Sequence, residues 1–483
     1  MTGLLIAGTT SDAGKTVVAT GLCRALARRG VRVAPYKAQN MSNNSMVCVA
    51  ADGTGAEIGR AQWIQALAAR ADPEPAMNPV LLKPGSDQRS HVVLMGQPWG
   101  SLSSADWMQG RAELAAAAHR AFDDLAARYD VIIAEGAGSP TEINLRAGDY
   151  VNMGLARHAR LPVVVVGDVD RGGVFAAFFG TVALLSPEDQ ALVAGFIVNK
   201  FRGQQQLLEP GLADVERVTG RRVFGTLPWH PELWLDSEDA LDLDGRRSVR
   251  AGARRVTVIR LPRISNFTDL DALGLEPDLD VVFASDPRGL SDADLVVLPG
   301  TRATISDLAW LRSRGLDAAV AAHAAAGKPV VGICGGFQML GAVIRDPQGV
   351  EGPPGEVAGL GLLDVETCFG ADKVLRLSDG GYEIHHGRVT RGDGADEFPG
   401  GARTGQVFGT MRHGSFEDDA LRGAFLAETL GLAPSGVSFA AARERRLELL
   451  ADLVEEHLDV DELLASARGG PPSGLPFLPP GAP

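Results

Sequence analysis

Short apolar runs alternate with longer stretches of helical periodicity along most of this chain. Runs typical of strands lie at residues 4–7, 31–34, 131–134, 163–166 and 196–198, and in the second half at 256–261, 281–284, 295–298 and 330–333. The Ala-rich stretch 107–127 predicts a long helix. Because this alternation is typical of βα units, we expect an α/β protein built on doubly wound parallel sheets.

A polar segment separates the two series of strands. Residues 236–254 contain many Asp, Gly and Arg residues without periodicity, which predicts a linker. This linker divides the chain into a first domain at 1–235 and a second domain at 255–468. Pro and Gly dominate the last stretch, 469–483, so we expect a disordered tail there.

Composition excludes several classes of protein. The 483 residues are 45% hydrophobic and 22% charged, which is a globular composition, and the formal charge of −14 argues against nonspecific nucleic-acid binding. No apolar run reaches the roughly 18–20 residues that span a bilayer, and no signal or transit peptide is recognisable, so we expect a cytoplasmic protein. Four widely spaced cysteines argue against a disulfide framework or a structural zinc site.

A glycine-rich motif follows the first expected strand. It reads GTTSDAGKT at 8–16 and leads into a helix expected at 17–28, which is the context of a P-loop, although five residues instead of four separate its two glycines. A turn that merely caps a helix is the alternative. Backbone N–H groups, an ammonium and a hydroxyl in this arrangement can bind phosphates and magnesium. The expected nucleotide-binding residues are Gly8, Thr9, Gly14, Lys15 and Thr16.

Two carboxylates are candidates for the metal site. Glu135 directly follows a buried strand, and Mg²⁺ needs only a hydroxyl and one or two carboxylates beside phosphate oxygens and water. Thr16, Glu57 and Glu135 meet that need, although Glu57 also fits a solvated carboxylate at the start of a helix. Lysine is rare, with six residues against 40 arginines. Lys15 and Lys37 both follow strands, where open α/β sheets bind ligands.

A second glycine-rich turn lies in the second domain. The segment PVVGICGGFQ at 329–338 is a strand that enters a helix through Gly-x-Cys-Gly-Gly, typical of a nucleophile elbow with Cys334 as nucleophile. The other cysteines fit buried small hydrophobes. Of nine histidines, His413 is the expected base because it lies in a Gly-flanked loop after a short strand. Backbone N–H groups near Gly300 and Thr301 are candidates for an oxyanion hole.

These motifs resemble known families. Cys334 in GICGGFQMLG with His413 is similar to class I, triad-type glutamine amidotransferases, which release ammonia from glutamine through a thioester. The first domain resembles the P-loop domain of dethiobiotin synthetase, whose members activate carboxylates with ATP. The stretches YKAQNMSNNS, EGAGSPTEINL, GDVDRGGVFA and GYEIHHG are similar to the cobyric acid synthase family, the glutamine-dependent amidases of cobalamin biosynthesis.

The resemblance implies a reaction and a set of roles. ATP would convert the b, d, e and g carboxylates of adenosylcobyrinic acid a,c-diamide, a corrinoid polycarboxylate, to acyl phosphates, and glutamine would supply ammonia. Lys37, Gln39 and Asn40 would lie toward the carboxylate, Asn199 near the nucleotide base, and Glu57 and Glu135 near magnesium. The residues implied for the oxyanion hole and glutamine are Gly300, Thr301, Gly335 and Gln338. Ser415 stands where ordinary members have Glu, so a Cys–His dyad is implied.

Two other functions fit parts of the pattern. The a,c-diamide synthase of the preceding step has the same domain pair, but KAQNMSNNS and GYEIHHG favour the later step. A partitioning-type ATPase, or a scaffold with an inactive glutaminase, is the alternative from a different class. The P-loop lacks the second lysine of partitioning ATPases, and both Cys334 and His413 are present, which argues against it. The sequence carries no information on the oligomeric state.

Overall fold

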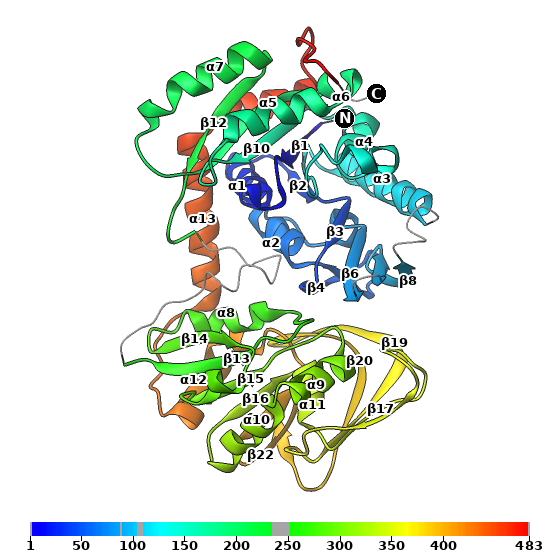
Figure 1. Cartoon of the computed structure of the whole chain (residues 1–483), viewed down its shortest axis with the longest axis vertical. Coiled ribbons are helices and arrows are strands. Elements are labelled where there is room, and N and C mark those ends of the chain that lie inside the picture. Colours follow the sequence, from blue (N-terminus) through cyan, green and yellow to red (C-terminus); the bar gives the residue numbers. More distant parts are fainter. Residues whose placement is uncertain (1, 87–88, 104–109, 234–251, 482–483) are drawn as a thin grey trace.

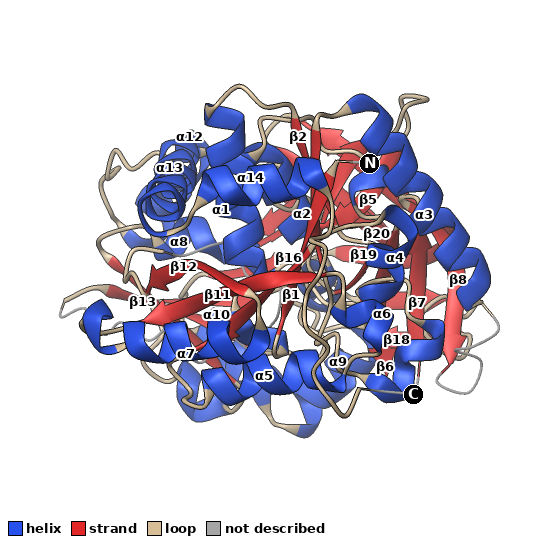
Figure 2. Ribbon diagram, turned by 90° about the horizontal axis from the view of Figure 1, so that it is seen from above, coloured by secondary structure: helices blue, strands red, loops and turns tan. Residues whose placement is uncertain are grey.

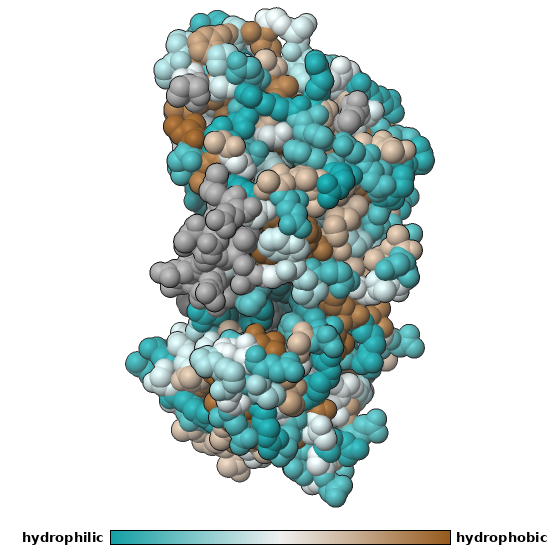
Figure 3. Space-filling model, turned by 90° about the vertical axis from the view of Figure 1, so that its right-hand side faces the viewer, coloured by the Kyte–Doolittle hydropathy of each residue, from teal (hydrophilic) through white to brown (hydrophobic). Residues whose placement is uncertain are grey.

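The computed structural model describes residues 2–86, 89–103, 110–233 and 252–481. Two α/β bodies lie one above the other along the long axis of the molecule (Figure 1), and helix α13 (Phe439–His457) connects them. The outline narrows between the bodies, and hydrophilic residues cover most of the face in Figure 3. Among the described residues, no helix is long and apolar enough to cross a membrane.

A parallel sheet forms the centre of the upper body. Its order is β12-β11-β10-β1-β9-β2, and every pairing is parallel. The strands are β1 (Gly3–Gly8), β2 (Val33–Tyr36), β9 (Val131–Glu135), β10 (Val163–Asp168), β11 (Val193–Phe201) and β12 (Arg222–Pro228). Most of these residues are buried, because helices cover both faces. The α/β prediction and the five expected strands are confirmed here.

Helices pack on the two faces of this sheet. They are α1 (Lys15–Arg28), α2 (Arg60–Ala68), α3 (Arg111–Arg128), α4 (Met153–Ala159), α5 (Val174–Leu184), α6 (Pro187–Gln190), α7 (Glu209–Thr219) and α14 (Val460–Gly469). Successive β1 residues face opposite ways: Leu4 and Ile6 pack with α1 and α13, whereas Leu5 and Ala7 pack with α3 and α5. Figure 2 shows α1, α13 and α14 on one side of the strands and α5 and α7 on the other.

Two small sheets extend the upper body toward the lower one (Figure 1). One has the order β3-β6-β7-β8, and the other pairs β4 with β5. Their strands are β3 (Gln39–Met41), β4 (Ser45–Val49), β5 (Gly55–Gly59), β6 (Val80–Ser86), β7 (Arg89–Leu94) and β8 (Gln97–Ser103). The expected list of strands did not include them.

The lower body contains a second sheet, with order β14-β13-β15-β16-β23-β22-β21. Its strands are β13 (Arg254–Ile259), β14 (Leu279–Ala284), β15 (Leu295–Leu298), β16 (Val330–Ile333), β21 (Asp396–Phe398), β22 (Gly401–Thr404) and β23 (Val407–Thr410). The pairings from β14 through β23 are parallel, and β21 and β22 add antiparallel strands at one edge. The four strands expected in this half are confirmed.

Helices and a side sheet complete the lower body. The helices are α8 (Asp271–Gly274), α9 (Thr304–Ser313), α10 (Leu316–Ala325), α11 (Gly335–Leu340) and α12 (Asp419–Leu430). The side sheet has the order β18-β17-β19-β20, with β17 (Val343–Asp346), β18 (Gly355–Ala358), β19 (Val365–Ser378) and β20 (Gly381–Arg391).

The C-terminal helices correct the expected domain boundaries. Leu447, Leu450 and Val454 of α13 are buried in the core that α1 forms on the upper sheet, and α14 joins the same core. The second domain therefore does not extend to residue 468, because the chain returns to the first domain after residue 439. Helical periodicity shows that a face is apolar but does not identify the core that covers it. The expected linker lies at 236–254, and its residues up to 251 are outside the described ones.

The prediction of a disordered tail is wrong for residues 470–481. Leu478 is buried, and its backbone N–H and carbonyl both pair with the side-chain amide of Gln190 at 2.9 Å. Arg221 donates to the Pro476 carbonyl at 2.6 Å. Pro and Gly exclude a helix, but an extended segment can still satisfy its backbone groups on a neighbouring surface.

Candidate active sites

The P-loop lies between β1 and α1 at the carboxyl end of the upper sheet. Gly14 has a φ of +101°, and a Cβ atom there would lie 1.8 Å from the Asn199 amide nitrogen, so glycine is required. The same nitrogen donates to the Ala13 carbonyl at 3.0 Å. Asn199 therefore supports the loop from β11, whereas the resemblance implied a position near the nucleotide base.

Lys15 lies at the inner side of this loop. Its ammonium donates to the carbonyls of Thr10 and Ser11 at 2.9 Å each and to the Gly138 carbonyl at 3.1 Å. These contacts hold the charge between the P-loop and the segment that follows β9. The role of Lys15 in binding phosphate groups stays a prediction of the sequence.

Glu135 is the centre of a buried polar cluster. One carboxylate oxygen accepts from the Thr16 hydroxyl and the Lys37 ammonium at 3.0 Å each, and the other accepts from the Gln65 amide at 2.6 Å. Burial alone would raise the pKa of Glu135, but Lys37 and these hydrogen bonds hold it below its usual value. The side chain is therefore a carboxylate at neutral pH.

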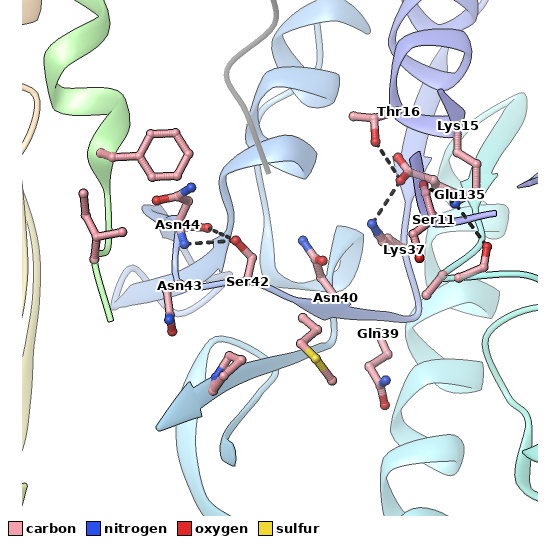
Figure 4. A pocket seen from close by; sticks show the side chains of 16 residues that line it. Ser11, Lys15, Thr16, Lys37, Gln39, Asn40, Ser42, Asn43, Asn44 and Glu135 are labelled. Carbon is pink, nitrogen blue, oxygen red and sulfur yellow. Dashed lines mark hydrogen bonds and ion pairs between the residues drawn. The ribbon is translucent and has the colours of Figure 1, made fainter. Parts of the chain in front are cut away.

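A pocket in front of the P-loop collects most of the expected residues. Figure 4 shows Lys15, Thr16, Lys37 and Glu135 grouped on one side, with Gln39 and Asn40 on the adjoining segment. Tyr150 donates to Gln39 at 2.5 Å, and Asn40 donates to Gln62 at 2.8 Å, so both amides are fixed. Ile264 and Phe267 of the lower body also line the pocket. The pocket is thus built from both domains.

Glu57 does not join this group. It is fully buried on β5, where Lys83 donates to one carboxylate oxygen at 2.5 Å and Lys373 of the lower body contacts the other. Burial would raise the pKa of Glu57, but the two lysines outweigh it and lower the pKa. Of the expected metal set of Thr16, Glu57 and Glu135, only Thr16 and Glu135 therefore lie together, because the fold turns β5 toward the lower body.

Thr16 and Glu135 fit a magnesium ion that also binds phosphate. A hydroxyl and an ionised carboxylate lie side by side at the P-loop, and both are hard oxygen ligands. In the described part of the chain, no group of three or more His, Cys, Asp or Glu side chains could hold a metal. The remaining ligands would therefore be phosphate oxygens and water, as is usual for Mg²⁺.

Cys334 stands at a sharp turn between β16 and α11. Its φ of 51° and ψ of −109° are strained for a residue with a side chain, and its N–H donates to the Thr410 carbonyl at 2.7 Å. A Cβ atom at Gly336 would lie 2.0 Å from the Leu298 carbonyl oxygen, so the turn requires glycine there. This geometry agrees with the nucleophile elbow expected from the sequence.

His413 is buried beside Cys334 and contacts an acid that the sequence did not indicate. Its Nδ1 lies 2.7 Å from one carboxylate oxygen of Asp269, whose other oxygen accepts from the Gly414 N–H at 2.8 Å. Burial would lower the pKa of His413, but Asp269 and then Cys334 outweigh it and raise the pKa to about 10. An imidazolium next to the sulfur is the charge that a cysteine nucleophile uses.

The implied Cys–His dyad is therefore corrected to a Cys–His–Asp arrangement. Asp269 lies 144 positions before His413 in the chain, in the turn Phe267–Leu270. No motif spacing could indicate it, because the contact forms only when this turn folds over the ends of β16 and β23. Asp269, from another part of the fold, thus supplies the carboxylate that ordinary members have as a Glu at the position of Ser415.

The expected oxyanion and glutamine residues surround the same sulfur. Thr301 and Gln338 line the Cys334 pocket. A Cβ atom at Gly300 would lie 3.1 Å from His413 Cε1, and one at Gly335 would lie 3.2 Å from the Thr301 backbone nitrogen. The loop after β15 therefore meets the elbow directly, where backbone N–H groups can stabilise an oxyanion.

Residues beside this site also contact the upper body. Tyr382 stacks on His413, with ring centroids 5.3 Å apart, and its hydroxyl donates to the Ser45 carbonyl at 3.1 Å. Asn266 accepts from the Ser45 N–H at 2.9 Å. Both backbone groups of Ser45 are therefore held by residues next to the glutaminase site. Tyr382 belongs to the GYEIHHG stretch, to which the sequence assigned no role.

Comparisons with known proteins agree with the two sites. Residues 4–242 match the family described as the CobQ/CobB/MinD/ParA nucleotide binding domain, and residues 255–421 match the CobB/CobQ-like glutamine amidotransferase domain. Cobyric acid synthases of Mycolicibacterium gilvum and Mycolicibacterium vanbaalenii are each 78% identical to this chain, and that of Mycobacterium tuberculosis is 76% identical. Each alignment covers 100% of both chains. The chain therefore belongs to the cobyric acid synthase family.

Proposed function

We propose that this chain uses ATP and glutamine to convert carboxylates of a corrinoid to amides. The observation that carries the proposal is that both pockets are shared between the domains. Ile264 and Phe267 of the lower body line the P-loop pocket, and Lys83 of the upper body lines the Cys334 pocket. Ammonia released at one site can then meet an activated carboxylate at the other with little exposure to solvent.

The upper site activates the carboxylate. A carboxylate is a poor electrophile until one of its oxygens becomes a leaving group, and transfer of the γ-phosphoryl group of ATP makes an acyl phosphate. Lys15 would neutralise phosphate charge, and a magnesium ion held by Thr16 and Glu135 would supply further positive charge. Lys37 is close enough to the same cluster to attract the substrate carboxylate.

The lower site releases ammonia. The sulfur of Cys334 attacks the amide carbon of glutamine, and backbone N–H groups near Thr301 and Gly335 stabilise the oxyanion. His413 gives its proton to the departing ammonia and later takes a proton from the water that hydrolyses the thioester. Asp269 keeps the imidazole oriented and charged.

In detail, we place the four new amides at the b, d, e and g positions of adenosylcobyrinic acid a,c-diamide, in the cytoplasm. Mass spectrometry of the purified protein with this substrate, glutamine, ATP and magnesium tests the assignment against a control without ATP. Stepwise addition of up to four amides is expected. Glutamine hydrolysis without amide formation would refute the acceptor, and cobyrinic acid would be tried next.

Division of labour between the sites has a separate test. Cys334→Ala is expected to abolish glutamine hydrolysis while free ammonia still supports amide formation. Equal loss with both nitrogen donors would contradict the proposed roles of the two domains.

A further inference from the structure

The Cys334 pocket contains an arginine that forms no ion pair with any residue that the structure describes. Arg302 lies in the loop between β15 and α9 and lines the pocket. Within the described part of the chain, its guanidinium group has no hydrogen bond or ion pair, whereas Lys83 and Lys373 in the same pocket both contact Glu57. Of these three cations, Arg302 is therefore the one available to bind an anionic ligand.

A carboxylate lies in the same pocket, and no cationic side chain in the described ranges contacts it. One oxygen of Glu351 accepts from the Thr304 hydroxyl at 3.1 Å, and the other accepts from the Ile305 N–H at 3.2 Å. Burial raises the pKa of Glu351 to about 7, although these donors and the field of Arg302 oppose the rise. The Asp346 carboxylate fixes the Glu351 backbone at 2.9 Å, so the side chain is well positioned.

The two charges face the space beside the nucleophile. The Thr304 hydroxyl also lies 3.2 Å from Gln338, one turn along the helix that Cys334 begins. Arg302 and Glu351 affect each other electrostatically, but they form no ion pair among the described residues. A ligand with one carboxylate and one ammonium group can therefore bind both without breaking an existing pair.

Glutamine has that pair of charges on its α-carbon. We propose that Arg302 binds the α-carboxylate of glutamine and that Glu351 binds its α-ammonium group, which directs the side-chain amide to Cys334. The planar guanidinium suits a carboxylate, because it can donate two parallel hydrogen bonds. This inference rests on the proposed glutamine hydrolysis and assigns its specificity to two residues that lie outside the motifs.

Substrate analogues separate the two contacts. Glutaramate lacks the α-ammonium group of glutamine, and 4-aminobutanamide lacks the α-carboxylate. Arg302→Met is expected to raise KM for glutamine by about 10- to 100-fold, the value of a charged hydrogen bond, and to leave KM for 4-aminobutanamide unchanged. Glu351→Gln is expected to raise KM for glutamine similarly and to leave KM for glutaramate unchanged. In both variants kcat should stay within about threefold, because the lost contacts act equally in ground and transition states.

Two further measurements make the result decisive. Arg288→Met, which removes a fully exposed arginine of the same domain, serves as the matched control and should leave KM unchanged. Calorimetry of glutamine binding to Cys334→Ser, with and without each second substitution, measures affinity independently of turnover. Equal losses for glutamine and for the corresponding truncated analogue, or unchanged affinity in calorimetry, would overturn the inference. If the wild-type protein bound glutamine but did not hydrolyse it, the proposed function would fail while the binding roles stood.

Discussion

Asp269→Asn tests the role of the acid beside His413. In the native protein, the two carboxylate oxygens accept from two donors, His413 Nδ1 and the Gly414 N–H, at 2.7 and 2.8 Å. An asparagine has a single oxygen, so it can accept from only one of them. Its NH₂ group would face the other donor, or would force the imidazole into the tautomer with the proton on Nε2.

The cost follows from these contacts. Replacing a charged hydrogen bond by a neutral one loses about 1–2 kcal/mol, and leaving a buried donor unpaired costs about 1–3 kcal/mol. A total of about 2–5 kcal/mol in the transition state corresponds to a rate about 30- to 5,000-fold lower. The lost charge also lowers the pKa of His413, by about one unit for each 1.4 kcal/mol.

The pH dependence has a definite sign. The pKa of His413 is raised to about 10, so its protonated form persists below that pH and is lost as the pH rises through it. Tyr382, the aromatic neighbour of His413, stays neutral because burial raises its pKa well above the usual value. At saturating glutamine, where the titration of Glu351 near pH 7 affects binding and not turnover, His413 of the wild-type protein should stay protonated from pH 6 to about 9 and glutaminase activity should not fall. In Asp269→Asn, activity should decline at lower pH.

The assay is glutamate release from pH 6 to 10, with ammonia-dependent amide formation as internal control. Asp271→Asn removes another buried carboxylate two residues away and is the matched control for a general effect on folding. Unchanged rate and pH profile in Asp269→Asn would refute the reasoning. So would an equal loss in Asp271→Asn, because it would indicate structural damage instead of a role at His413.

Three other predictions concern metal binding, stability and coupling. Thr16→Val and Glu135→Gln should each raise the Mg²⁺ concentration that half-saturates amide formation by about 10-fold or more, and unchanged Mg²⁺ titrations would contradict this site. Leu450→Ala should lower the free energy of unfolding, measured in urea, by about 2–5 kcal/mol, because Leu450 is 1% exposed in the core beside α1. A loss below about 1 kcal/mol would argue against that packing, because substitutions on the surface have effects of that size. Tyr382→Phe keeps the ring but removes the hydrogen bond to Ser45, so more ammonia should escape and the ratio of glutamate released to amide formed should rise. An unchanged ratio would show that this contact does not couple the two sites.

Local geometry explains which features could be predicted. Strands β1, β9 and β10 follow from apolar runs, because a strand buried on both faces needs apolar side chains throughout. The P-loop and the Cys334 turn follow from the order of strand, glycine-rich turn and helix, which are neighbours along the chain, so the sequence itself contains this signal. The atoms that exclude a Cβ at Gly14 and Gly336 belong to Asn199 and Leu298, which are distant in sequence and became known only from the structure.

Long-range packing explains the features that could not be predicted. Asp269 reaches His413, Glu57 pairs with Lys373, and α13 returns to the upper core through contacts between residues more than 100 positions apart. Such pairings depend on how complete elements dock, and neither periodicity nor motif spacing specifies docking. The sequence by itself determined the two glycine-rich turns, one with Lys15 and the other with Cys334. Only the tertiary structure decided which acid lies beside His413, which carboxylate lies beside Thr16 and which residues of the two domains line each pocket, because a distant residue enters a site only after the domains have packed.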